Sequence, residues 1–178
     1  TTLINTATLT SATPEVSLAD NSASGFTRIV APAAAISIWK RTSGYGWPNG
    51  YFLDNDMYWI IRVTNEGNTQ IRGGVRVTDV LTDDLTYVGF SGEGWTCAAV
   101  GQVVTCDYLA TIANRVQAPE VSIKTKPSDP NYPDRQLFRN TASVTTIAPY
   151  GLWDQSTTQG YLHYAHDLKI EKSAPYPF

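Results

Sequence analysis

The chain has 178 residues, of which 42% are hydrophobic and 16% charged, and its formal net charge is −3. Its 13 Lys and Arg residues are spread thinly, so no basic patch points to nucleic acid or to an anionic membrane surface, and we expect neither as a partner. No apolar run approaches the roughly 20 residues that a membrane-spanning helix needs, and the opening TTLINTATLT is typical of a mature exported protein.

Apolar and polar residues alternate along most of the chain, and helical periodicity is absent. The clearest case is MYWIIRVTN at 57–65, in which every second residue from Met57 to Val63 is apolar. Further short segments follow, each bounded by Gly, Pro, Asn or Asp; they are GGVRVTDVL, LTYVGF, PEVSIKTK and LFRNTASVTT. Short strands separated by turns, with no helix between them, predict an all-β fold, an antiparallel Greek-key β-sandwich.

Two cysteines lie in GWTCAAVGQVVTC, which is typical of two short strands that fold back on each other. Such a hairpin would bring Cys97 and Cys106 together as a disulfide. The alternative is a pair of free, buried thiols. A disulfide would indicate an oxidising, extracytoplasmic environment.

Aromatic residues gather in the connection SGYGWPNGYFLDND at 43–56. Rings of this kind can stack on sugars, which would make a surface glycan a partner. They can equally cap one open end of the sandwich or contact a neighbouring subunit, and we favour these roles because aromatic side chains supply packing area wherever a core or interface needs it. The residues concerned are Tyr45, Trp47, Tyr51 and Phe52.

A succession of motifs between residues 36 and 146 resembles the immunoglobulin-like conserved-repeat domain of bacterial and archaeal surface proteins, the family called domain of unknown function eleven. In order, the motifs are ISIWK, MYWIIRVTNEGN, VRVTDVLTDDLTYV, GWTC with VVTC, and FRNTASVTT. Trp59 stands where the family usually has Tyr, and Thr82 where it usually has Pro. The resemblance implies an immunoglobulin-like sandwich with extra terminal strands, in an exported wall, envelope or filament component that is not an enzyme.

The sequence of the family's closing strand occurs twice in this chain. NTASVTT at 140–146 lies where the family has it, and NTATLTS at 5–11 precedes the domain. LKIEK at 168–172 similarly resembles ISIWK at 36–40, and the linkers 19–26 and 154–161 correspond apart from a one-residue gap. We therefore divide the chain into an N-terminal extension with a closing-type strand (1–35), a repeat domain (36–147) and a C-terminal extension that resembles the start of a next repeat (148–178).

An unpaired closing strand exposes an apolar face and backbone polar groups, so a partner for it is expected. The chain can be a segment of a tandem array, it can add residues 1–35 to its own sandwich, or it can donate the strand to a neighbouring subunit. We favour donation, which makes a head-to-tail filament of copies of itself at the cell surface or outside the cell. The donated face would be Leu3, Asn5, Ala7 and Leu9. The alternative function is a surface adhesin or carbohydrate-binding module in a tandem array.

No spacing of nucleophile, base and metal ligands points to an enzyme or a cofactor, and His163 and His166 have no third ligand nearby in the sequence, so no metal site is expected.

One group of three residues indicates a different chemistry. Exported immunoglobulin-like pilin and adhesin domains often join a Lys on the first strand to an Asn on the last, with a buried acid as promoter, and Lys40, Asn140 and Asp79 fit these roles. The alternative is that Asn140 bonds strand ends while the Lys40 side chain extends to solvent. Lys172 and Asn5 repeat the two partners without the acid.

Overall fold

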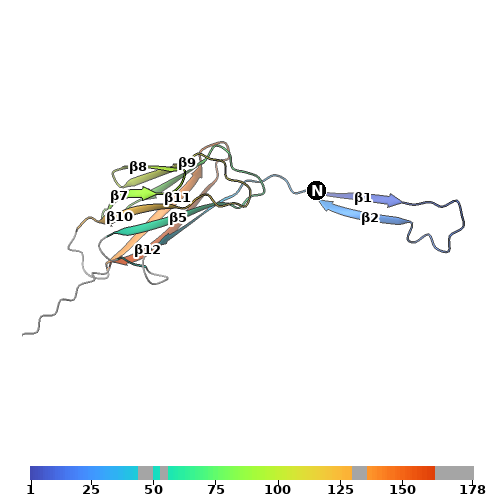
Figure 1. Cartoon of the computed structure of the whole chain (residues 1–178), viewed down its shortest axis with the longest axis horizontal. Helices are drawn as coiled ribbons and strands as arrows, with labels where there is room; N and C mark the ends of the chain where they lie inside the picture. Colours follow the sequence, from blue (N-terminus) through green and yellow to red (C-terminus); the bar gives the residue numbers. More distant parts are fainter. Residues whose placement is uncertain (44–49, 53–55, 130–135, 163–178) are drawn as a thin grey trace, which may run out of the picture. The chain divides into compact units, whose positions relative to one another are not determined.

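The computed structural model describes residues 1–43, 50–52, 56–129 and 136–162, and all regular structure in these ranges is β-strand. The chain forms two units, Thr1–Ala33 and a second unit that begins at Ala34 (Figure 1). The first unit is a single antiparallel hairpin of β1 (Thr2–Thr8) and β2 (Ser22–Arg28). Because β1 pairs with β2 in a two-stranded sheet of its own, the structure does not show residues 1–35 adding strands to the sandwich.

The second unit is a β-sandwich of two sheets, and the predicted all-β antiparallel sandwich is confirmed (Figure 1). Its strands are β3 (Ile36–Thr42), β4 (Gly50–Phe52), β5 (Met57–Asn65), β6 (Val75–Val80), β7 (Leu85–Ser91), β8 (Trp95–Val100), β9 (Val103–Tyr108), β10 (Val121–Pro127), β11 (Leu137–Thr146) and β12 (Trp153–Leu162). One sheet has the order β3-β5-β10-β7 and the other β4-β12-β11-β6-β9-β8. All pairs are antiparallel except β4 with β12, which is parallel.

The core lies between the two sheets and is made mainly by alternate residues of β3 and β5–β11, as strand geometry requires. On β5 the inward residues are fully buried, whereas Tyr58 on the other face is exposed. The fully buried core side chains of largest volume are Trp59, Phe138, Met57, Ile61, Ile71, Leu85 and Ile123. Three polar residues, Lys40, Asp79 and Asn140, occupy inward positions in the same alternation.

The structure corrects two boundaries drawn from the sequence. Residues 154–161 belong to strand β12, which pairs along its length with β11, so the sandwich extends to Leu162 and not to residue 147. The segment 19–26 likewise contains most of β2. Both segments resemble linkers in the sequence because most of their side chains are small or polar, and a polar strand shows no apolar alternation. Two polar residues of β12, Asp154 and Ser156, accept hydrogen bonds from backbone N–H groups of β3.

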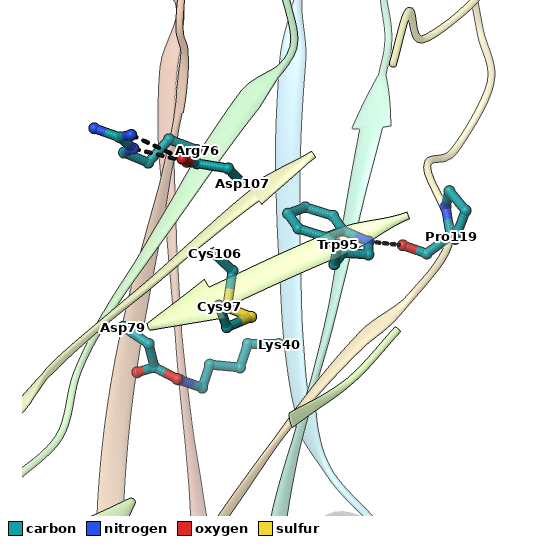
Figure 2. The surroundings of a disulfide bond; sticks show 8 residues. All are labelled: Lys40, Arg76, Asp79, Trp95, Cys97, Cys106, Asp107 and Pro119. Carbon is teal, nitrogen blue, oxygen red and sulfur yellow. Dashed lines mark hydrogen bonds and ion pairs between the residues drawn. A yellow bond between two sulfur atoms is a disulfide. The ribbon is translucent and has the colours of Figure 1, made fainter. Parts of the chain in front are cut away.

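The disulfide between Cys97 and Cys106 joins β8 to β9, where the two residues lie directly opposite each other with Cα atoms 4.0 Å apart. Gly101 begins the tight turn of this hairpin with a φ of 58°, a conformation that glycine adopts without strain. The two cysteines are 106 − 97 = 9 positions apart, and in the chain-entropy account closing a loop of this length contributes about 2–3 kcal/mol of stability. Figure 2 shows the disulfide beside the side chains of Lys40 and Asp79.

Candidate isopeptide site

The candidate site is built from three strands that belong to both sheets. Lys40 lies on β3 of the four-stranded sheet, whereas Asp79 and Asn140 lie on the adjacent strands β6 and β11 of the six-stranded sheet. Asp79 is directly opposite Ala142, so Asn140 is its diagonal neighbour on the same face. The packing of the two sheets therefore brings a Lys side chain against an acid–amide pair.

The three side chains contact one another within the core. Lys40 Nζ donates a hydrogen bond to Asp79 Oδ2 at 2.7 Å, and Asn140 Nδ2 donates to the same oxygen at 3.2 Å (Figure 2 shows the Lys40–Asp79 contact). Their exposed fractions are 3% for Lys40, 0% for Asp79 and 1% for Asn140. Charged groups are seldom buried this deeply unless they are paired, because desolvation costs several kcal/mol per ion. The alternative that Lys40 extends to solvent does not describe this structure.

Burial moves both ionisable groups toward their neutral forms. Desolvation lowers the pKa of Lys40 from 10.5 to about 8, although the nearby Asp79 carboxylate opposes this shift. Desolvation raises the pKa of Asp79 above its usual value, against the opposing effects of Lys40 and Asn140. A neutral amine and a neutral carboxylic acid in contact have the protonation states that an acid-promoted attack on an amide requires.

Two oxygen atoms of the site have no hydrogen-bond partner among the described residues. They are Asp79 Oδ1 and Asn140 Oδ1, and both are buried. An unpartnered buried polar atom typically costs about 1–3 kcal/mol and calls for an explanation. A proton on Asp79 provides one, because a protonated carboxyl becomes a donor and an amide oxygen is an acceptor.

Trp59 shields the amine from water. Its ring centroid lies 5.5 Å from Lys40 Nζ, and its Nε1 donates a hydrogen bond to Thr125 Oγ1 at 2.9 Å in the core. Both residues are fully buried, so one face of the Lys40 ammonium meets an aromatic surface instead of solvent. The fully buried ring contributes to the desolvation that lowers the Lys40 pKa.

Strand β12 fixes the edge strand that carries Lys40. The backbone N–H of Ile38 donates to Asp154 Oδ2 at 2.8 Å, and that of Lys40 donates to Ser156 Oγ at 3.1 Å. These bonds satisfy backbone donors that an edge strand would leave open, and they tie β3 to the opposite sheet beside the site. The sequence pattern does not single out Asp154 or Ser156, although their spacing of two residues places them on one face of a strand.

The other residues singled out from the sequence lie elsewhere. Leu3, Asn5 and Ala7 are exposed on β1, and Leu9 follows it and is also exposed. Tyr51 and Phe52 belong to β4, whereas Tyr45, Trp47, His163, His166 and Lys172 fall outside the described residues.

Within the described ranges, no group of three or more His, Cys, Asp or Glu residues is arranged to hold a metal ion. The same ranges contain no helix of the length and apolar character needed to span a bilayer.

No family model and no curated protein matches the chain. Among solved structures, it is similar to BcpA, the major pilin subunit of Bacillus cereus, with 16% identity and a TM-score of 0.48, over 71% of this chain and 39% of that one. It is also similar to a 35 kDa C-terminal fragment of the major pilin GBS80 of Streptococcus agalactiae, with 11% identity and a TM-score of 0.49, over 72% of this chain and 56% of that one. The chain thus spans 39% of the length of the first of these structures and 56% of the second. At such identities the likeness concerns the fold alone.

Proposed function

We propose that this chain is a structural subunit of an extracellular or cell-surface filament, and that its sandwich is locked by an isopeptide bond between Lys40 and Asn140. The observation that carries the proposal is the buried contact of Lys40, Asp79 and Asn140 across the two sheets. Membership of the conserved-repeat family of surface proteins is part of the same proposal. It rests on the motifs between residues 36 and 146.

The reaction needs no external catalyst. Lys40 first transfers a proton to Asp79, which leaves a neutral amine next to a carboxylic acid. Nζ then attacks Cγ of Asn140 while the acid protonates the amide oxygen, and collapse of the tetrahedral intermediate breaks the bond from Cγ to Nδ2. The attacking nitrogen loses its proton through Asp79 to the departing nitrogen. The products are an amide between the two side chains and one ammonia, so the mass falls by one ammonia and no oxidant or cofactor is consumed.

The location of the bond suits a protein under tension. Lys40 lies on β3, the first strand of the sandwich, and Asn140 lies on β11. With a covalent link between them, tension along the chain passes through the link and not through residues 41–139. The strands β5 to β10 would then carry little of the force. A filament subunit needs this property, and forced unfolding is governed by the rate at which such a fold opens.

Assembly is assigned to the N-terminal strand. Donation of β1 from one subunit to the sheet of the next is a heterologous, head-to-tail contact, which builds a filament when it repeats without closing. The partners are copies of the same chain, and the disulfide supports an extracytoplasmic location because such bonds persist in oxidising environments.

The bond is tested by the intact mass of the folded chain under denaturing conditions. We expect a mass one ammonia below that of the sequence with its disulfide formed, and a branched peptide joining Lys40 to Asn140 after proteolysis. The variant Lys40→Met should keep its full calculated mass. A wild-type chain of full mass would refute the cross-link.

Strand donation is tested by two arginine substitutions at adjacent residues of β1. The offset between the repeated strands is 140 − 5 = 135, so Leu3 corresponds to buried Phe138 and Ile4 to exposed Arg139. Leu3→Arg should abolish filaments in electron micrographs, because it places a charge on the face to be buried. Ile4→Arg should assemble like the wild type. Equal assembly of both variants would mean that β1 is not donated through this face.

A further inference from the structure

The N-terminal hairpin reproduces the closing hairpin of the sandwich. In β1, Asn5, Thr6 and Ala7 match Asn140, Thr141 and Ala142 of β11, and both strands pair with an antiparallel neighbour. A cross-strand hydroxyl pair is also common to both. Thr6 Oγ1 lies 2.8 Å from Ser24 Oγ, and Thr141 Oγ1 lies 2.8 Å from Thr157 Oγ1. The likeness is therefore one of structure as well as of sequence.

The two hairpins differ in what covers them. The inward side chains Phe138, Asn140 and Ala142 of β11 are buried, and the strand has β6 on its other edge. Every residue of β1 is exposed, including Leu3 at 53%, and Leu9 just beyond it is 68% exposed. An isolated two-stranded hairpin is at best marginally stable in water, and this one presents the face of a closing strand without a core to close.

The register of the N-terminal hairpin agrees with the absence of a core. Gly160 lies opposite Phe138, but its sequence counterpart Gly25 lies opposite Asn5 rather than Leu3. The shift is two residues, so each side chain keeps its face. Register is weakly fixed where neither face of a strand is buried. The equivalence between the two hairpins is therefore clearest for β1, because its sequence aligns with that of β11 without a gap.

Asn5 can supply the amide of an isopeptide site, but the N-terminal hairpin supplies no Lys to react with it. Residues 1–33 contain no Lys, and the residue opposite Asn5 is Gly25. The corresponding Asn140 has both Asp79 and Lys40 within contact. What the hairpin lacks is an open sandwich, meaning strands equivalent to β3–β10 that present a buried Lys–Asp pair but have no closing hairpin of their own.

We propose that Asn5 is a second modification site, which becomes covalently joined to the Lys of such an open sandwich when β1–β2 fills its closing-hairpin position. The inference rests on the proposed function, because it requires the same chemistry. Its partner differs from an intact copy of this chain, in which β11 and β12 already fill the closing-hairpin position. The partner amine forms a bond to Cγ of Asn5, the bond from Cγ to Nδ2 breaks, and one ammonia leaves with the proton relayed by the partner carboxyl. In the free hairpin we do not expect the reaction, since Asn5 is exposed to water and lies opposite Gly25.

The test uses two versions of the full chain. The acceptor carries Asn5→Ala and Asn140→Ala, together with a protease site introduced between β10 and β11, and it is cleaved after folding. The released β11–β12 segment is removed in urea, and the remainder is refolded with an excess of donor. The donor is the wild-type chain, in which Lys40 is already consumed. We expect a covalent 1:1 product that is one ammonia lighter than its parts, with Lys40 of the acceptor joined to Asn5 of the donor.

Matched variants and a positive control decide the outcome. A donor with Asn5→Ala, or an acceptor that also carries Lys40→Met, should give no product, whereas a donor with Ile4→Arg should react. A synthetic peptide spanning residues 137–162 must add to the same acceptor if its closing position has been vacated. Reaction of the peptide without reaction of the donor overturns the inference but leaves the internal cross-link standing. Failure of both also overturns it, because a position that cannot be refilled is no docking site. A wild-type chain of full mass would separately refute the proposed function.

Discussion

Replacing Asn140 with Ala is expected to lower the free energy of unfolding by about 5 kcal/mol, because it removes the proposed covalent link between distant residues. The link encloses 140 − 40 = 100 residues, and closing a loop of this length is worth about 4.7 kcal/mol in the chain-entropy account. For a domain of this size the loss corresponds to roughly 10–20 °C in Tm. Urea denaturation with the disulfide kept oxidised measures it.

A double-mutant cycle separates the link from local packing. Each substitution also changes buried packing beside Asp79, so each single variant has a local effect besides the loss of the link. Once either variant has broken the link, the other can cost only its local part. The double variant should therefore be several kcal/mol more stable than the sum of the single effects predicts. Additive effects would contradict a covalent bond between these side chains.

Most strands of the sandwich could be predicted because one face of each of them is apolar. The same alternation places Lys40, Asp79 and Asn140 at inward positions, so the sequence already indicates that these polar residues are buried. Their meeting could not be derived in this way, because Lys40 comes from one sheet and the other two from the opposite sheet. Which residues face each other across a sandwich depends on sheet packing, and strand periodicity carries no information about it.

The polar strands mark the limit of the sequence pattern. β12 contacts β3 through Asp154 and Ser156, which accept backbone hydrogen bonds, so its inward face is not apolar and it resembles a linker in the sequence. β2 is also not recognisable as a strand in the sequence, since SASGFTR has little apolar alternation. Its strand character follows from pairing with β1. Repetition of a motif was the better signal here, because it identified the closing strand and its copy where periodicity alone could not distinguish their roles.

Replacing Asp79 with Ala is expected to stop bond formation altogether, so that the purified variant keeps its full calculated mass. Without the carboxyl, no group accepts the proton of Lys40 or protonates the amide oxygen of Asn140. The isosteric variant Asp79→Asn should behave in the same way, since it preserves volume but cannot relay a proton. An Asp79→Ala chain that still loses one ammonia would show that the acid is not required.

The Asp79→Ala variant should also acquire a pH dependence that the wild type lacks. Lys40 would remain a free amine, and loss of the carboxylate that opposes desolvation takes its folded-state pKa below about 8, while the unfolded value stays near 10.5. Between these two values the unfolded chain binds more protons than the folded chain, so stability rises with pH across that window, by at most about 1.4 kcal/mol per pH unit. With the proposed bond formed, Lys40 of the wild type is an amide and does not titrate. Urea denaturation at pH 7 and pH 10 should thus give a larger gain for the variant than for the wild type, and equal gains would mean that the wild-type amine is also free.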